Sequence, residues 1–170
     1  MYPRILAIDL RSQLFGFAVL EGPQTLLDFG RRILRMTSAQ DNALLVRKKI
    51  GRLITFFVPT VIVVKHTSGC NDRELLKRKN TIAVIKHEAE LRSVELVRLK
   101  RRDIYQVFEQ SGKTSKYKIA GLIAEMFPEV EWKLPPNRKN WQPEHHNMAI
   151  FDAISVGLAY FALFDRVLEG

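Results

Sequence analysis

The order of apolar runs along the chain predicts a sheet that opens with a meander. Apolar runs over 4–10 and 14–20 and an alternating run over 25–34 are separated by short polar turns, which is typical of three antiparallel strands. A β-branched run at 61–64 predicts a strand buried on both faces, hence a central or parallel one. Another strand is predicted over 94–99, so strands and helices alternate in the second half.

Helices are predicted where apolar residues recur every three to four positions. Ser38 and Asp41 have the spacing of a helix-capping pair, and the helix after them is expected to end before Pro59. Pro143 suits the first turn of a last, largely apolar helix. The remaining predictions are helices over 71–90, from 104 to 108 and over 114–127, a loop over 131–142, and a final helix running to about residue 163.

Length and charge limit the function classes. At roughly 150 residues per domain, the 170 residues are expected to form a single domain, 1–170. The net charge of +9 favours a polyanionic partner, and nucleic acid is the commonest one. The single cysteine, Cys70, excludes an intrachain disulfide and fits a reducing cytoplasm. No apolar stretch approaches the ~18 residues of a membrane span, so we expect no membrane partner.

Two carboxylates stand in apolar surroundings. Asp9 closes the first predicted strand, and Asp152 lies within the apolar segment 148–154 of the last helix. An ionised carboxylate there is costly unless it is paired or bound to a metal. A turn cap would also explain Asp9, and pairing with one buried Arg or Lys would explain Asp152. Together the two acids suggest one shared cation site.

The segment Ile5-Leu6-Ala7-Ile8-Asp9-Leu10-Arg11-Ser12, with Gly16 following, resembles the opening strand of the RuvC-type Holliday junction resolvases of the RNase H-like superfamily. Three later segments are similar in the same order, at 59–65, 104–120 and 152–159. The resemblance implies an α/β fold with an RNase H-like mixed sheet, in which three antiparallel strands precede parallel strands and helices flank both. The opening segment is also similar to the actin and sugar-kinase hairpin, which would bind a nucleotide phosphate.

The resemblance further implies hydrolysis of phosphodiester bonds with Mg²⁺ or Mn²⁺. Asp9 would bridge two metal ions and Asp152 would hold one of them. Two expected ligands are absent, because Lys65 stands where the family has a glutamate and Ala149 where it has a second acid or a histidine. Lys65 would repel a metal or replace one by neutralising both aspartates. The residues that could replace the missing ligands are His145, His146, Glu144, His66 and Asp72. The catalytic candidates are Asp9, Asp152, Lys65 and His145.

His145 lies seven residues before Asp152, on roughly the same helical face but about 10.5 Å along the axis. That separation is too long for one shared metal unless the helix starts later. A solvated or phosphate-facing histidine near a helix start is an equally good interpretation. Glu144, for its part, would suit the first turn of a helix without any metal.

Basic residues gather in six clusters along the chain, which favours a phosphate-binding surface with salt-sensitive affinity. The segment that resembles the family's substrate-facing loop carries three lysines. The residues that we predict to contact nucleic acid are Arg11, Arg101, Arg102, Lys113, Lys116 and Lys118. Trp132 and Trp141 flank the loop before the last helix, and we expect them to anchor it in the core; stacking on a splayed base is the alternative.

Three functions stay open at this point. The first is a divalent-metal-dependent endonuclease acting on branched or structured DNA, which the two retained acids favour. The second is a catalytically inactive RuvC-like protein that binds nucleic acid, and the third is an actin- or sugar-kinase-like phosphate-binding domain. A homodimer is suggested by analogy, because two sites suit a two-fold junction.

Overall fold

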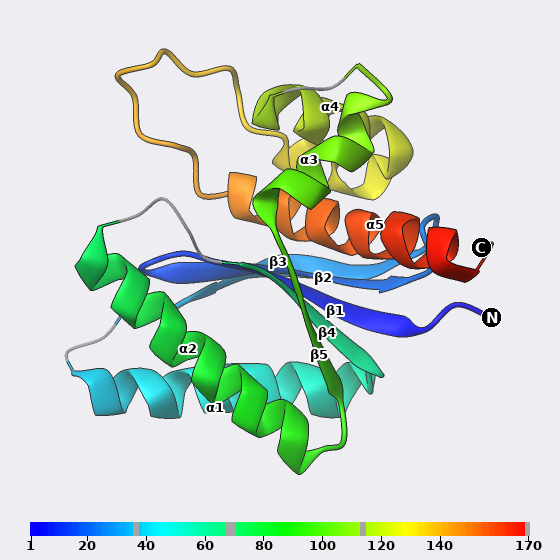
Figure 1. Cartoon of the computed structure of the whole chain (residues 1–170). Helices are drawn as coiled ribbons and strands as arrows, with labels where there is room; N and C mark the ends of the chain where they lie inside the picture. The colour runs from blue at the N-terminus through cyan, green and yellow to red at the C-terminus, as the bar shows by residue number, and fades with distance from the viewer. Residues whose placement is uncertain (36–37, 67–70, 113–114, 169–170) are drawn as a thin grey trace.

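The computed structural model describes residues 1–35, 38–66, 71–112 and 115–168, with side chains to Phe164. Helices lie on both faces of one twisted sheet (Figure 1). The strands are β1 (Arg4–Leu10), β2 (Leu14–Glu21), β3 (Leu26–Ile33), β4 (Val61–Lys65) and β5 (Glu95–Leu99). The helices are α1 (Ala39–Phe57), α2 (Asp72–Leu91), α3 (Arg101–Glu109), α4 (Lys116–Met126), the 3₁₀ helix η1 (Pro128–Lys133) and α5 (Met148–Leu168).

The sheet has the strand order β3-β2-β1-β4-β5. β1, β2 and β3 pair antiparallel, whereas β4 pairs parallel to both β1 and β5. This arrangement confirms the predicted meander and the predicted parallel strand at 61–64. In the register of the sheet, Asp9 faces Gly16 on β2, and Ile8 faces Val64 on β4. The last residues of β1 and β4 therefore end side by side.

Strand alternation divides the core into two layers. Leu6 and Ile8 of β1 pack in the layer beneath α1 and α2. Ile5 and Ala7 pack in the opposite layer, beneath α3, α4 and α5. Figure 1 shows the same division, with α1 and α2 below the sheet and the other helices above it. Both layers are closed by buried apolar side chains, so the sheet is a rigid support for the residues at its ends.

The predicted start and end of the first helix are confirmed. The Oγ atom of Ser38 accepts a hydrogen bond from the backbone N–H of Asp41 at 3.1 Å, as a capping residue does. The helix ends at Phe57, two residues before Pro59. Asn71 caps α2 in the same way, by accepting from the backbone N–H of Glu74 at 2.9 Å.

The predicted start of the last helix is wrong. Pro143 does not lie in its first turn, since α5 begins at Met148 and runs to Leu168. The backbone N–H of Met148 donates to the carbonyl of His145 at 3.0 Å, which marks where the chain turns into the helix. A proline fixes φ equally well in turns and in first helical turns, so its position did not locate the boundary. The loop predicted from 131 also begins later, because η1 extends to residue 133.

The expected anchoring of the tryptophans in the core is also wrong. Trp132 and Trp141 are 73% and 76% exposed. The indole N–H of Trp132 donates to the carbonyl of Glu129 at 3.0 Å, and Lys133 lies 3.9 Å from the centre of the ring. Other apolar residues close the layer beneath η1, so these rings were not required there.

None of the helices in the described part of the chain combines the length and the apolar character that a bilayer crossing requires. Cys70 and Lys113 lie outside the described residues.

Candidate functional site

Six charged side chains from separate parts of the chain meet at the carboxyl end of β1. Three are acidic and three are basic, so their formal charges cancel. They come from β1, the β1–β2 turn, the end of β4, the first turn of α4, the segment before α5, and α5 itself. This group, which we call the ion-pair network, consists of Asp9, Arg11, Lys65, Lys116, Glu144 and Asp152.

Strand alternation brings Asp9 and Lys65 together. Asp9 continues the side of β1 that faces α5, and Lys65 continues the same side of the neighbouring strand β4. Asp9 is only 1% exposed, and its Oδ1 atom lies 2.7 Å from the Nζ atom of Lys65. Its Oδ2 atom accepts from the Nε atom of Arg11 at 3.0 Å. Both oxygens of this buried carboxylate are therefore held by cations.

Arg11 links all three acids of the network. While its Nε atom binds Asp9, its Nη2 atom donates to Oδ2 of Asp152 at 2.7 Å, and its Nη1 atom donates to Glu144. The turn that positions it is closed by a hydrogen bond from the backbone N–H of Arg11 to the carbonyl of Leu14 at 2.9 Å. The guanidinium group thus fills the space between the two aspartates that the sequence singled out.

Lys116 closes the network from the side of α4. Its Nζ atom lies 2.9 Å from Oδ2 of Asp152 and 2.9 Å from Oε1 of Glu144. Ser115 caps α4 by accepting from the backbone N–H of Lys118, and this fixes the turn that carries Lys116. Glu144, which lies in the irregular segment before α5, accepts from both Lys116 and Arg11.

A close approach between β2 and α5 places Asp152 over the end of β1. A Cβ atom added to Gly16 would lie 2.0 Å from the backbone oxygen of Ala149, so only glycine permits this contact. Ala149 is fully buried in the first turn of α5, and Asp152 follows it by three residues. The close contact between Gly16 and Ala149 therefore sets the position of Asp152, which lies one turn further along α5.

The charges of the network shift the pKa values of its acids in different directions. Burial alone would raise the pKa of Asp9, but the charges of Lys65 and Arg11 outweigh it and hold that pKa below its usual value. Burial and the neighbouring Asp9 carboxylate raise the pKa of Asp152, against the opposing charges of Lys65 and Lys116. For Glu144, the contacts with Lys116 and Arg11 outweigh burial and lower the pKa.

The residues of the network do not fit a divalent cation. Mg²⁺ binds carboxylate and other oxygen atoms directly, yet each carboxylate here is contacted by basic nitrogen atoms at hydrogen-bond distance. A metal between Asp9 and Asp152 would require the Arg11 guanidinium to leave. Within residues 1–35, 38–66, 71–112 and 115–168, no three His, Cys, Asp or Glu side chains are grouped so that they could hold a metal ion.

The other predicted site residues lie outside the network. His145 is exposed, and its Nδ1 atom accepts from the backbone N–H of Asn147 at 3.1 Å. Arg101, Arg102 and Lys118 are exposed on α3 and α4. Of the predicted nucleic-acid contacts, Arg11 and Lys116 instead face carboxylates within the protein, and their contact with nucleic acid stays a prediction.

The linking role of Arg11 was not predicted from the sequence. One signal was present, since Arg11 follows Asp9 by two residues in a tight turn. Residues 11, 116 and 144 lie far apart in the sequence, so no local spacing pattern predicts that they meet. Glu144 was considered as a ligand or a helix-dipole partner, whereas the structure shows that it is a partner of two cations.

Comparison with known proteins gives no match by sequence. No protein-family model and no curated protein matches the chain.

Solved structures do share the fold. Thermus thermophilus RuvC in complex with a Holliday junction substrate superposes with a TM-score of 0.75 at 14% identity, covering 98% of this chain and 96% of that one. A second structure of Thermus thermophilus RuvC gives a TM-score of 0.73 at 15% identity, covering 96% of each chain. The yeast mitochondrial Holliday junction resolvase gives 0.75 at 16% identity, covering 99% of this chain and 82% of that one.

These superpositions extend over almost the whole chain, and the sheet has the three antiparallel strands followed by parallel strands that the resemblance implied. At such low identity, the likeness concerns the fold. The chain has a RuvC-like fold of the RNase H-like type.

Proposed function

We propose that this protein binds branched or structured DNA through its RuvC-like fold without hydrolysing it. The observation that carries the proposal is the ion-pair network, in which Arg11, Lys65 and Lys116 neutralise the three acids at the end of β1. The proposal corresponds to the inactive alternative of the sequence analysis rather than to the metal-dependent endonuclease that the retained acids favoured.

Three features support binding to nucleic acid. The chain has a net charge of +9, which attracts phosphate backbones. RuvC, whose structure includes a Holliday junction, shares the fold over nearly the full length. Arg101, Arg102 and Lys118 are exposed on the α5 side of the sheet, and Trp132 and Trp141 expose rings on which unpaired bases could stack.

Charge balance argues against metal-dependent cleavage. A two-metal site needs carboxylates whose negative charge is available to the ions. The acids of the network are compensated within the protein, and Lys65, which stands where the resemblance to the RuvC-type resolvases implies a glutamate, pairs with Asp9 instead. Binding Mg²⁺ at Asp9 and Asp152 would take two of the three carboxylate partners of Arg11 and the Asp9 partner of Lys65, and both cations are partly buried, so the loss is unfavourable.

The endonuclease remains the second candidate because Asp9 and Asp152 both contact one guanidinium group. This shared contact places the two acids at the same site, as a metal-dependent mechanism would require. In that case Asp9 and Asp152 would hold Mg²⁺ or Mn²⁺, with Lys65 and His145 as further catalytic residues, after displacement of Arg11.

Binding and cleavage can be separated with a labelled four-way DNA junction. We expect the wild-type protein to retard the junction, with affinity that falls as salt rises, and to leave the strands intact in Mg²⁺ or Mn²⁺. The matched control is Asp9→Asn, which keeps the side-chain shape. Metal-dependent cleavage by the wild type that disappears in Asp9→Asn would establish the endonuclease, and failure to bind any DNA would refute both candidates.

The homodimer and the cytoplasmic location stay predictions. Two copies of the chain would present two sites to a junction with two-fold symmetry. Sedimentation equilibrium of the protein with and without the junction would test this stoichiometry. A reducing compartment is favoured by the lone Cys70, which cannot form an intrachain disulfide.

A further inference from the structure

A basic groove lies between β3 and α1, on the face of the sheet opposite to α5. It has a volume of about 1050 Å³. Among the described residues that line it, six carry basic side chains and one, Asp28, carries an acidic one. The basic residues are Arg32, Arg47, Lys48, Lys49, Arg52 and Arg92. The groove therefore concentrates much of the positive charge of the chain on a surface that the ion-pair network does not include.

A buried acid holds two of these arginines in place. Glu88 of α2 is 3% exposed, and its Oε1 atom accepts from the Nε atom of Arg47 at 2.9 Å. Its Oε2 atom accepts from the Nη1 atom of Arg92 at 2.5 Å. Gly51 makes room for this cluster, because a Cβ atom there would lie 3.0 Å from the Nη2 atom of Arg92. Glu88 thus fixes both guanidinium groups beside α1.

The two arginines keep part of their surface open to solvent, with side-chain exposures of 49% for Arg47 and 34% for Arg92. One carboxylate against two guanidinium groups leaves an excess positive charge. Guanidinium groups that are already oriented lose less conformational entropy when they bind phosphate. The Arg47–Glu88–Arg92 cluster is therefore suited to bind an anion at the groove surface.

An exposed aromatic ring lies in the same groove. Phe56 is 80% exposed and packs edge-on against Phe57, with 4.8 Å between ring centres. Lys48, Arg52 and Phe56 follow one another at intervals of four residues, so they form a stripe about 12 Å long on one face of α1. Basic residues that track a backbone, next to a ring that stacks on a base, are typical of single-strand binding.

We propose that the groove between β3 and α1 binds a segment of single-stranded nucleic acid, with phosphates against Arg47, Arg52 and Lys48 and a base stacked on Phe56. This proposal rests on the proposed function and adds a second contact surface to it. A branched DNA with an unpaired arm would then contact both faces of the sheet. A second copy of this chain is a poor occupant, because two such basic grooves repel each other.

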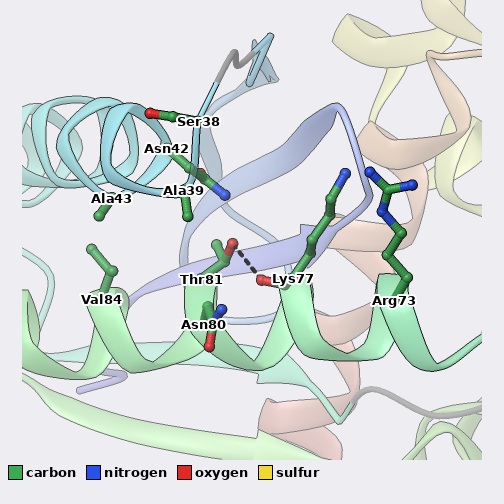
Figure 2. A pocket seen from close by; sticks show the side chains of 9 residues that line it. All are labelled: Ser38, Ala39, Asn42, Ala43, Arg73, Lys77, Asn80, Thr81 and Val84. Atoms are coloured by element: carbon green, nitrogen blue, oxygen red, sulfur yellow. Dashed lines mark hydrogen bonds between the residues drawn. The ribbon is translucent and has the colours of Figure 1, made fainter.

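The test measures the affinity for fluorescein-labelled oligothymidylate by anisotropy at about 50 mM and 200 mM salt. The groove variant is Lys48→Glu/Arg52→Glu, which reverses two exposed charges. The matched control is Arg73→Glu/Lys77→Glu on α2, which changes the net charge equally. Figure 2 shows that these two side chains extend from α2 at the pocket between α1 and α2, which Ser38 and Thr81 also line.

We expect the groove variant to bind oligothymidylate at least tenfold more weakly than the control variant does. Phe56→Ala, which should fold because the ring is exposed, is expected to weaken binding about tenfold at both salt concentrations, since stacking is not screened. This variant also carries the test if the charge reversal prevents folding, which circular dichroism would reveal.

The outcomes distinguish the two proposals. If the wild-type protein binds neither oligothymidylate nor the junction, the proposed function fails. If the wild-type protein binds the junction but not oligothymidylate, only the groove proposal fails. The groove proposal alone also fails if the groove and control variants lose affinity for oligothymidylate equally and Phe56→Ala loses none. A groove variant that loses affinity for duplex DNA alone would mean that the groove holds a duplex, and would overturn the single-strand proposal.

Discussion

Replacing Lys65 with methionine tests whether the ion-pair network is a structural substitute for a metal. The variant keeps the length of the side chain and removes its charge. The Nζ atom of Lys65 lies 2.7 Å from a carboxylate that is 1% exposed, so the loss leaves a buried negative charge with less compensation. Breaking one partner of a buried pair costs about 3–5 kcal/mol, and Arg11 still binds Asp9, so we expect about 3 kcal/mol.

Thermal unfolding followed by circular dichroism measures this loss. For a chain of this size, each kcal/mol lowers the melting temperature by about 2–4 °C, so Lys65→Met is expected to melt about 6–12 °C lower than the wild type. Asp9→Asn serves as the partner substitution in a double-mutant cycle. If Lys65 and Asp9 interact as the structure shows, the free energy of unfolding lost in the double variant is smaller than the sum of the two single losses by at least about 1.5 kcal/mol.

Additive losses, within about 0.5 kcal/mol, would refute the reasoning. Lys65 would then contribute through packing alone, and the acids would be available to other cations. The cycle is measured in EDTA and again in Mn²⁺, because a metal bound at Asp9 would stabilise Lys65→Met more than the wild type. Equal values in both buffers are expected if the site does not take a metal.

Three further predictions follow from other parts of the structure. Gly16→Ala should lower the free energy of unfolding by at least about 2 kcal/mol, because the new Cβ would meet the backbone of α5. Gly121→Ala, whose new Cβ would meet no atom within 4 Å, should raise it by about 0.5–1 kcal/mol. Chemical denaturation compares the two variants, and equal effects would contradict the close approach of β2 and α5. Hydrogen bonds from Arg47 and Arg92 outweigh burial and lower the pKa of Glu88 from 4.5, so the contribution of Glu88 to stability is complete above that pH and is lost as the pH falls through the lowered pKa. Urea titrations over acidic pH should therefore show a smaller pH dependence of the free energy of unfolding for Glu88→Gln than for the wild type, and an unchanged pH dependence would argue against the cluster. Lys65→Glu should gain melting temperature on addition of Mn²⁺ while the wild type gains none, and a shift in the wild type would indicate that its network already admits a metal.

Much of the fold could be predicted because its signals are local. The apolar run that begins at Arg4 and ends at Leu10 gave β1 with the observed bounds, and Ser38 gave the start of α1. The final boundary failed because Pro143 suits several backbone conformations. The tryptophan prediction failed because a large ring near a helix is common in cores, and only the complete packing shows that η1 needs neither ring.

The candidate site was predicted only in part. Asp9 and Asp152 were expected to meet because each is an acid in apolar surroundings, and the structure places both against Arg11. Lys65 was expected either to repel a metal or to replace one by neutralising both aspartates; its Nζ atom contacts Asp9, whereas Asp152 is contacted by Arg11 and Lys116. Arg11 and Lys116 were assigned to nucleic acid because a basic residue in sequence carries no sign of whether an internal acid faces it.

Two buried acids of this protein each hold two cations, and the exposure of those cations determines what each group can do. At Asp9, the side chains of Lys65 and Arg11 are 24% and 19% exposed, and the other acids of the network balance their charge. At Glu88, the arginines are more exposed, and one carboxylate pairs with two guanidinium groups. The first arrangement stabilises the end of the sheet and presents little charge to solvent. The second fixes positive charge on an open groove, so a polyanion should gain more from the α1 face than from the ion-pair network at the end of β1.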